Sequence, residues 1–170
     1  MTIHPKPKPA KKPKVKRITA PKRRKLLETE LEALMRELVW WRDGGECVLK
    51  SMDGGRCGGP IQWGHLIARQ KSPYLKFALG NSFCQCKTHN GLEHWGDPIF
   101  GIWYDKTFGV AAREALWEAR NAHINRLPPE WELEEWIAEV KDLLDDRPAT
   151  YTRDLLVERG YFGRWPREKG

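Results

Sequence analysis

The chain has 170 residues, of which 30 are Lys or Arg and 23 are Asp or Glu, a length that suits one folded domain with appendages. Eleven of the basic residues lie within the first 25 positions, which contain no acidic residue, so the rest of the chain carries 19 basic and 23 acidic residues and is slightly acidic. No apolar run reaches the length of a signal peptide or a membrane span, which argues against a membrane protein and predicts a cytoplasmic location.

Residues 1–25 are rich in Pro and Lys and contain only scattered apolar side chains, so they cannot bury enough surface to fold alone. We expect a disordered basic tail that attracts DNA phosphates without sequence preference, an attraction that weakens with salt. A solubilising arm and a nuclear import signal in PKRRKL are the alternatives. The tail residues expected to contact DNA are Lys22, Arg23, Arg24 and Lys25.

A folded domain is expected over residues 26–147. Apolar residues at three- and four-residue steps predict an amphipathic helix over about 24–42, which the sequence Asp43-Gly44-Gly45 then ends. The apolar positions of this helix are Leu27, Leu31, Leu34, Met35, Leu38 and Val39.

The next segment predicts two short strands followed by a helix. Seven of the residues in 47–60 are Gly, Cys or Pro, a composition typical of a loop that needs a crosslink. We predict a strand over 61–67, a connecting loop over 71–80 and a second strand over 81–84. A helix should begin near Thr88.

Two further helices are predicted over about 109–126 and 130–146, and residues 148–170 are expected to form a helical extension with an aromatic, basic end. Most of the nine tryptophans are expected to fill the core. A base-stacking role stays open for Trp63, Trp95 and Trp165.

The cysteines predict a metal site, because four cysteines in a reducing compartment favour metal over disulfides. Zinc takes four thiolate or imidazole ligands in a closed tetrahedral site, which stabilises a segment with little core of its own. We predict a structural zinc bound by Cys47, Cys57, Cys86 and His89. The competing set replaces His89 with Cys84, which leaves only one residue between two of the ligands.

An ordered set of motifs runs through residues 35–145: VWWRDGGEC, WGHLIAR, LKF, GN, CKTHN and, later, YDKTFG. This set resembles the HNH, or ββα-metal, endonucleases, and among them the NinG/Rap family of phage recombination nucleases. The resemblance implies an α+β, mostly helical fold. A small zinc-stapled ββα-metal core would be flanked by an N-terminal helix and by two or three C-terminal helices.

Three positions depart from the family pattern. Nine residues separate Cys47 from Cys57, where the family has two, and His89 stands where the family has a cysteine, a change that zinc accepts. Gln62 stands where the family often has an acidic residue, so a carboxylate metal ligand would have to come from elsewhere. The nearest carboxylates in sequence are Glu93 and Asp97.

His65 is the candidate general base, because an imidazole that is neutral near pH 7 can deprotonate the water that attacks a phosphodiester. By resemblance, Asn90 would help to hold Mg²⁺ or Mn²⁺ through its amide oxygen, and His94, four residues on, is the second candidate ligand. In the HNH layout, Asn81 does not touch the metal. It ties the loop back across the site and orients His65.

Arg69 and Lys76 are expected to clamp phosphate, since a guanidinium can bridge two phosphate oxygens and stabilise developing charge. Arg42 is a weaker candidate, and an ion pair with Asp43 or another acid is an equal expectation.

These features together predict a zinc-containing DNA endonuclease that depends on Mg²⁺ or Mn²⁺ and hydrolyses phosphodiester bonds. The resemblance implies phage recombination or replication intermediates such as branched DNA as substrates, and a homodimer would suit an enzyme that resolves junctions. Two alternatives stay open. One is a catalytically silent zinc module that binds DNA, and the other is an accessory protein that docks partners through its tryptophan-rich helices.

Overall fold

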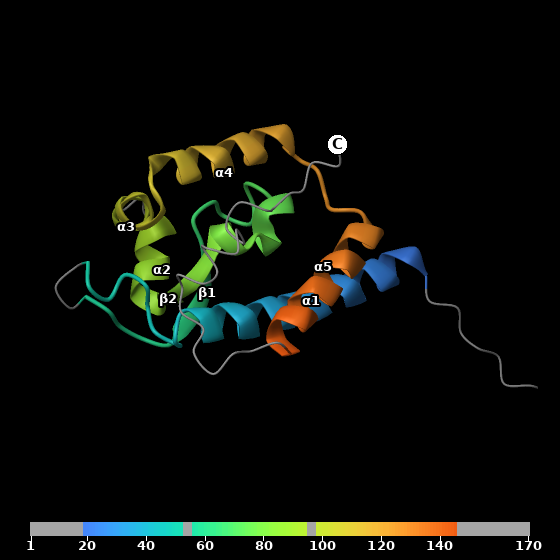
Figure 1. The fold of residues 1–170 in the computed structure, drawn as a ribbon, viewed down its shortest axis with the longest axis horizontal. Helices are drawn as coiled ribbons and strands as arrows, with labels where there is room; N and C mark the ends of the chain where they lie inside the picture. The colour runs from blue at the N-terminus through green and yellow to red at the C-terminus, as the bar shows by residue number, and fades with distance from the viewer. Residues whose placement is uncertain (1–18, 53–55, 95–97, 146–170) are drawn as a thin grey trace, which may run out of the picture.

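The structure, a computed structural model, describes residues 19–52, 56–94 and 98–145, with residues 92–94 described by their backbone alone. Within these residues the protein is α+β and mostly helical, as predicted, with five α-helices around one two-stranded sheet (Figure 1). The extension predicted over 148–170 lies outside the described residues.

Helix α1 (Ala20–Arg42) has Pro21 in its first turn, where a missing backbone N–H costs no hydrogen bond. Its buried stripe of Leu31, Met35, Leu38 and Val39 confirms the predicted amphipathic helix. The helix begins four residues before the predicted start. Residues 20–25, which the composition assigned to the basic tail, form the first turns of α1.

Helix α5 (Glu130–Asp145) packs along α1, as the orange and blue helices of Figure 1 show. Its buried face is the predicted apolar stripe: Leu133, Trp136, Ile137, Val140, Leu143 and Leu144. At the start of α5, Glu130 and Glu134 both pair with Arg23 of α1. The contact between these two helices thus forms one wall of the domain.

The predicted order of strand, loop, strand and helix is confirmed. Strand β1 (Ile61–His65) pairs antiparallel with β2 (Ser82–Cys86), in the register that runs from Ile61 opposite Cys86 to His65 opposite Ser82. Two short 3₁₀ turns, η1 (Tyr74–Phe77) and η2 (Leu79–Asn81), lie in the connection. Helix α2 (Lys87–His94) follows β2 directly.

Arg42 holds the end of α1 against β2. Its guanidinium pairs with Asp43 and donates to the backbone carbonyls of Leu79 and Ser82 at 3.0 and 2.6 Å. Asp43 in turn accepts the backbone N–H of Cys84 at 2.7 Å. A buried pair needs such additional hydrogen bonds to offset its desolvation, and this pair has them. The predicted ion pair of Arg42 with Asp43 is confirmed.

Helices α3 (Ile99–Phe108) and α4 (Val110–Ala122) follow. The patterns of the sequence predicted α4 but not α3. Gly109 between them has φ +88°, a conformation that strongly favours glycine and ends α3. The aromatic residues of α3 surround Phe83 of β2: Phe100, Trp103, Tyr104 and Phe108. Among the described residues, no helix combines the length and apolar character needed to cross a bilayer.

Candidate functional site

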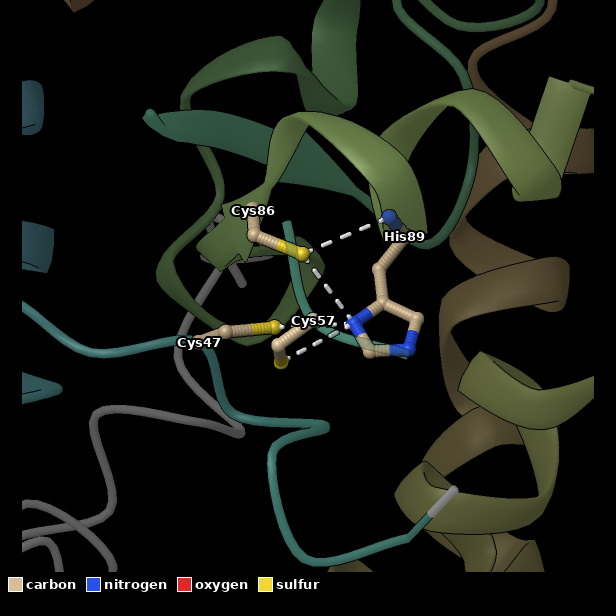
Figure 2. Close-up of side chains that lie close together, drawn as sticks. All are labelled: Cys47, Cys57, Cys86 and His89. Carbon is tan, nitrogen blue, oxygen red and sulfur yellow. Dashed lines mark hydrogen bonds between the residues drawn. The ribbon is translucent and has the colours of Figure 1, made fainter. Parts of the chain in front are cut away.

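Four residues predicted as zinc ligands lie together beside the hairpin (Figure 2). The three thiol sulfurs of Cys47, Cys57 and Cys86 surround the Nδ1 nitrogen of His89, at 3.3, 3.5 and 3.2 Å respectively. All four candidate ligand atoms lie within 4.8 Å of one another. The loop after α1 supplies the first two residues, and the end of β2 and the start of α2 supply the other two.

This geometry fits a tetrahedral metal site. Bond lengths of about 2.3 Å to sulfur and about 2.0 Å to nitrogen place sulfur and nitrogen about 3.5 Å apart around zinc, close to the three separations in the cluster. A single ring nitrogen cannot hydrogen-bond well to three thiols at once, so a shared cation explains the convergence better. The cluster could hold a metal such as zinc.

The backbone of the cluster also favours thiolate at Cys86. Burial raises the pKa of this thiol, but the backbone N–H groups of His89 and Gly58, together with the neighbouring cysteines, outweigh that effect and lower it to about 7. Cys84, the alternative ligand, points away from the cluster, and its thiol lies 3.6 Å from the carbonyl oxygen of Val39. The ligand set with His89 is therefore the one that the structure brings together.

A cavity of about 470 Å³ lies at the end of β1 and includes His65. We call it the His65 cavity, and among the residues that line it are Trp63, His65, Arg69, Lys71, Asn90 and Trp117. These residues come from β1, the loop after it, α2 and α4. The cavity thus brings Asn90, a candidate metal ligand, to two predicted site residues from more than 20 positions earlier in the chain: His65, the candidate base, and Arg69, a candidate phosphate clamp.

The imidazole of His65 is held by one hydrogen bond. Its Nε2 lies 2.9 Å from the backbone carbonyl oxygen of Lys76. Because a carbonyl only accepts, Nε2 must carry the proton, which leaves Nδ1 with a free lone pair in the neutral ring. Burial lowers the pKa of His65 to about 4, and the positive charges of Arg69, Lys76 and Arg36 act in the same direction. The imidazole is therefore neutral near pH 7.

Asn81 closes the loop that carries this carbonyl. Its side-chain oxygen accepts the backbone N–H of Ile67 at 2.7 Å, and its amide nitrogen donates to the carbonyls of Ile67 and Leu75, both at 3.0 Å. The side chain is fully buried. Asn81 does not line the cavity. It fixes the loop between β1 and β2 through its bonds to the backbone of Ile67 and Leu75.

Asn90 lies on α2, and its amide nitrogen donates to the side-chain oxygen of Gln62 at 2.8 Å. This bond fixes the orientation of the Asn90 amide through its nitrogen, so the amide oxygen of Asn90 is not the atom that binds Gln62. Gln62 thus acts as an acceptor for Asn90.

Gly64 precedes His65 on β1, and the space beside it is filled. A Cβ at this position would lie 1.8 Å from the side-chain oxygen of Gln85, a fully buried residue of β2. No carboxylate side chain fits at position 64 while Gln85 keeps this rotamer. The packing of Gln85 therefore accounts for the glycine before the histidine.

The predicted phosphate-binding residues lie in different places. Arg69 is exposed at the rim of the His65 cavity, where Lys71 joins it. The ammonium group of Lys76 instead pairs with Glu32 of α1, so the structure does not bring it to the cavity. In the predicted tail, Arg23 pairs with α5 and Arg24 pairs with Glu28, while Lys22 and Lys25 lie in the same first turns of α1.

Other candidates cannot be placed by their side chains. The backbone of His94 ends α2, but its side chain lies outside the described residues, as do those of Glu93 and Asp97. Trp117 was not among the tryptophans considered for base stacking, and only the structure places it at the His65 cavity. Its position in an amphipathic helix gives no sequence signal that it would line a cavity.

Comparison of the chain with protein-family models, with curated proteins and with solved structures finds no match. The metal cluster and the His65 cavity are therefore the features of the molecule that bear on its function.

Proposed function

We propose that the protein is a metal-dependent DNA endonuclease of the HNH, or ββα-metal, class. The observation that carries this proposal is the placement of His65. Its Nε2 is committed to the carbonyl of Lys76, while its Nδ1 is left as the basic nitrogen of a neutral imidazole in a cavity shared with Asn90 and Arg69. The cluster of three cysteines and His89 would hold a structural zinc that fixes the start of α2, and hence Asn90, against the hairpin.

In the proposed reaction, Nδ1 of His65 takes a proton from a water molecule as its oxygen attacks the phosphorus of a DNA backbone phosphate. A new P–O bond forms on one side of phosphorus, and the bond to the leaving sugar oxygen breaks on the other. The guanidinium of Arg69 binds the non-bridging phosphate oxygens and stabilises the charge that develops on them.

The residues present fit a divalent cation with a thin protein shell. The amide oxygen of Asn90 is fixed by the bond to Gln62 and is of the donor type that Mg²⁺ and Mn²⁺ prefer. Water and phosphate oxygens would complete the coordination. A cation held there would stabilise the negative charge on the leaving oxygen.

A second candidate function is a zinc-containing DNA-binding module without catalytic activity. Its specific support is the absence of a carboxylate among the described residues that line the His65 cavity, together with Gln62 and Gly64 at positions where an acid would be expected to assist metal binding. Branched DNA as substrate, a phage origin and a homodimer belong to the proposal through the family resemblance alone.

The experiment that separates the two candidates measures nicking of supercoiled plasmid DNA in Mg²⁺, in Mn²⁺ and in EDTA, with DNA affinity measured in parallel. The endonuclease proposal predicts nicking with either cation and none in EDTA. Binding without nicking in any of the three conditions would leave the silent module as the function. A four-way junction and a linear duplex of the same sequence, cleaved side by side, test the preference for branched DNA.

A further inference from the structure

Trp117 occupies an unusual position for a tryptophan. It lies on α4 and lines the His65 cavity, yet its side chain is 39% exposed. Helix α4 buries Leu116, the neighbouring residue, as its anchor to the domain. Within the described part of the chain, no ring and no cation is paired with the Trp117 indole. Core packing therefore does not explain this side chain.

The other described tryptophans differ from Trp117 in burial or in place. Trp63, Trp103 and Trp136 are buried in the core. Trp41 is partly buried, and Trp40 and Trp131 are 54% and 45% exposed, but none of these three lines the cavity. Trp117 is thus the described tryptophan that combines an accessible ring with the cavity, which makes Trp131 a suitable control.

The chemistry around Trp117 fits a nucleotide. Among the described residues that line the cavity, none is acidic, and Arg69 and Lys71 supply positive charge at the rim. The cavity volume of about 470 Å³ lies within the range of small-ligand pockets, roughly 300–1,000 Å³. An aromatic face beside cations is the combination that binds a base and its phosphate together.

We propose that Trp117 is a stacking platform for an unpaired base next to the phosphate that His65 acts on, so that the protein selects DNA with an unpaired base over perfect duplex. This inference rests on the proposed function for the role of His65. Bases inside a paired helix are stacked on one another and do not expose a face to a side chain, whereas an unpaired base can leave the stack at lower cost.

The test measures affinity in EDTA, where no hydrolysis takes place, for a duplex with a single-nucleotide bulge and for the fully paired duplex of the same sequence. Trp117→Leu is expected to lower affinity for the bulged duplex about tenfold or more and to change affinity for the paired duplex by less than twofold. Trp117→Phe, which keeps a ring, should retain most of the preference, and Trp131→Leu should retain all of it.

Equal losses of affinity on both duplexes, no loss on either, or the same loss in Trp131→Leu would overturn the inference. Zinc content and thermal unfolding check that each variant is folded, and Trp117→Met serves in place of the leucine variant if that one does not fold. A preference that depends on Trp117 without nicking in Mg²⁺ or Mn²⁺ would sink the endonuclease proposal alone. Nicking without such a preference would sink the Trp117 inference alone.

Discussion

The carbonyl oxygen of Lys76 accepts the Nε2 proton of His65 at 2.9 Å, although the two residues are eleven positions apart in the chain. This single bond sets which ring nitrogen is basic and which direction the ring faces. Lys76 was expected to bind phosphate through its ammonium group. Instead its backbone carbonyl holds the ring of His65, while the ammonium group pairs with Glu32.

The first prediction concerns pH. The folded protein holds the pKa of His65 at about 4, against an ordinary value of 6.5. Between these two pH values the unfolded chain binds a proton that the folded protein does not, so the free energy of unfolding should fall as the pH is lowered through this window. The loss should approach roughly 3 kcal/mol by pH 4.

The measurement is urea unfolding of the wild type and of His65→Gln from pH 4 to pH 7.5. The cluster of Cys47, Cys57, Cys86 and His89 is the same in both proteins, so the difference between the two curves isolates His65. An NMR titration of the ring nitrogens gives the pKa and the tautomer directly. A difference that does not change with pH, or a proton found on Nδ1, would contradict the assignment.

The second prediction concerns Asn81. Asn81→Ala removes the side-chain partners of the backbone N–H and carbonyl of Ile67 in a buried loop, and leaves the carbonyl of Leu75 with the N–H of Ala78 alone, so we expect a loss of at least about 2 kcal/mol of unfolding free energy. Nicking should fall as well, because the loop that carries the carbonyl of Lys76 loses its anchor. Asn121→Ala removes an exposed amide on α4 and should change stability by less than about 0.5 kcal/mol.

The third prediction concerns the metal cluster. Cys57→Ser should abolish tight zinc binding, whereas Cys84→Ser should keep one zinc per chain, because only the first of these sulfurs faces Nδ1 of His89. His89→Cys should also retain zinc, since the site accepts either ligand type. Metal analysis of the purified proteins gives the zinc content. Loss of zinc from Cys84→Ser together with its retention in Cys57→Ser would reverse the assignment.

The fourth prediction concerns Gly64. Gly64→Ala forces a methyl group against the buried side chain of Gln85 and should cost about 1–3 kcal/mol of stability. Gly101→Ala, at an open position inside α3, should be neutral or stabilising by up to about 1 kcal/mol. Chemical denaturation measures both. If the contact is the cause, the double variant Gly64→Ala/Gln85→Ala should lose less stability than the sum of the two single variants.

Local patterns in the sequence predicted much of the fold. The apolar stripes of α1 and α5 have a helical period, and the spacing of cysteines around the Gly-His strand predicted the cluster that forms. Helix α3 was missed because five of its first six residues are apolar, and such a continuous run shows little helical periodicity. Pro98 before it and Gly109 after it were the available signals.

The details of the His65 cavity could not be predicted from the sequence. They depend on contacts between distant elements, such as Lys76 with Glu32 or Gln85 with Gly64, whose strength no local pattern reveals. The position of Trp117 at the cavity could not be predicted either. A tryptophan on an amphipathic helix is expected in the core, and only the packing of α4 shows where its ring lies.

The most direct test of the account is the rate of plasmid nicking by His65→Gln, compared with wild type and with His123→Gln at equal zinc content. His123 stacks on Tyr74 at the end of α4 and does not line the His65 cavity, so it controls for loss of a histidine as such. We predict a loss of about a hundredfold or more in His65→Gln, the range for a general base, and wild-type nicking in His123→Gln. Equal rates in all three proteins would contradict the account.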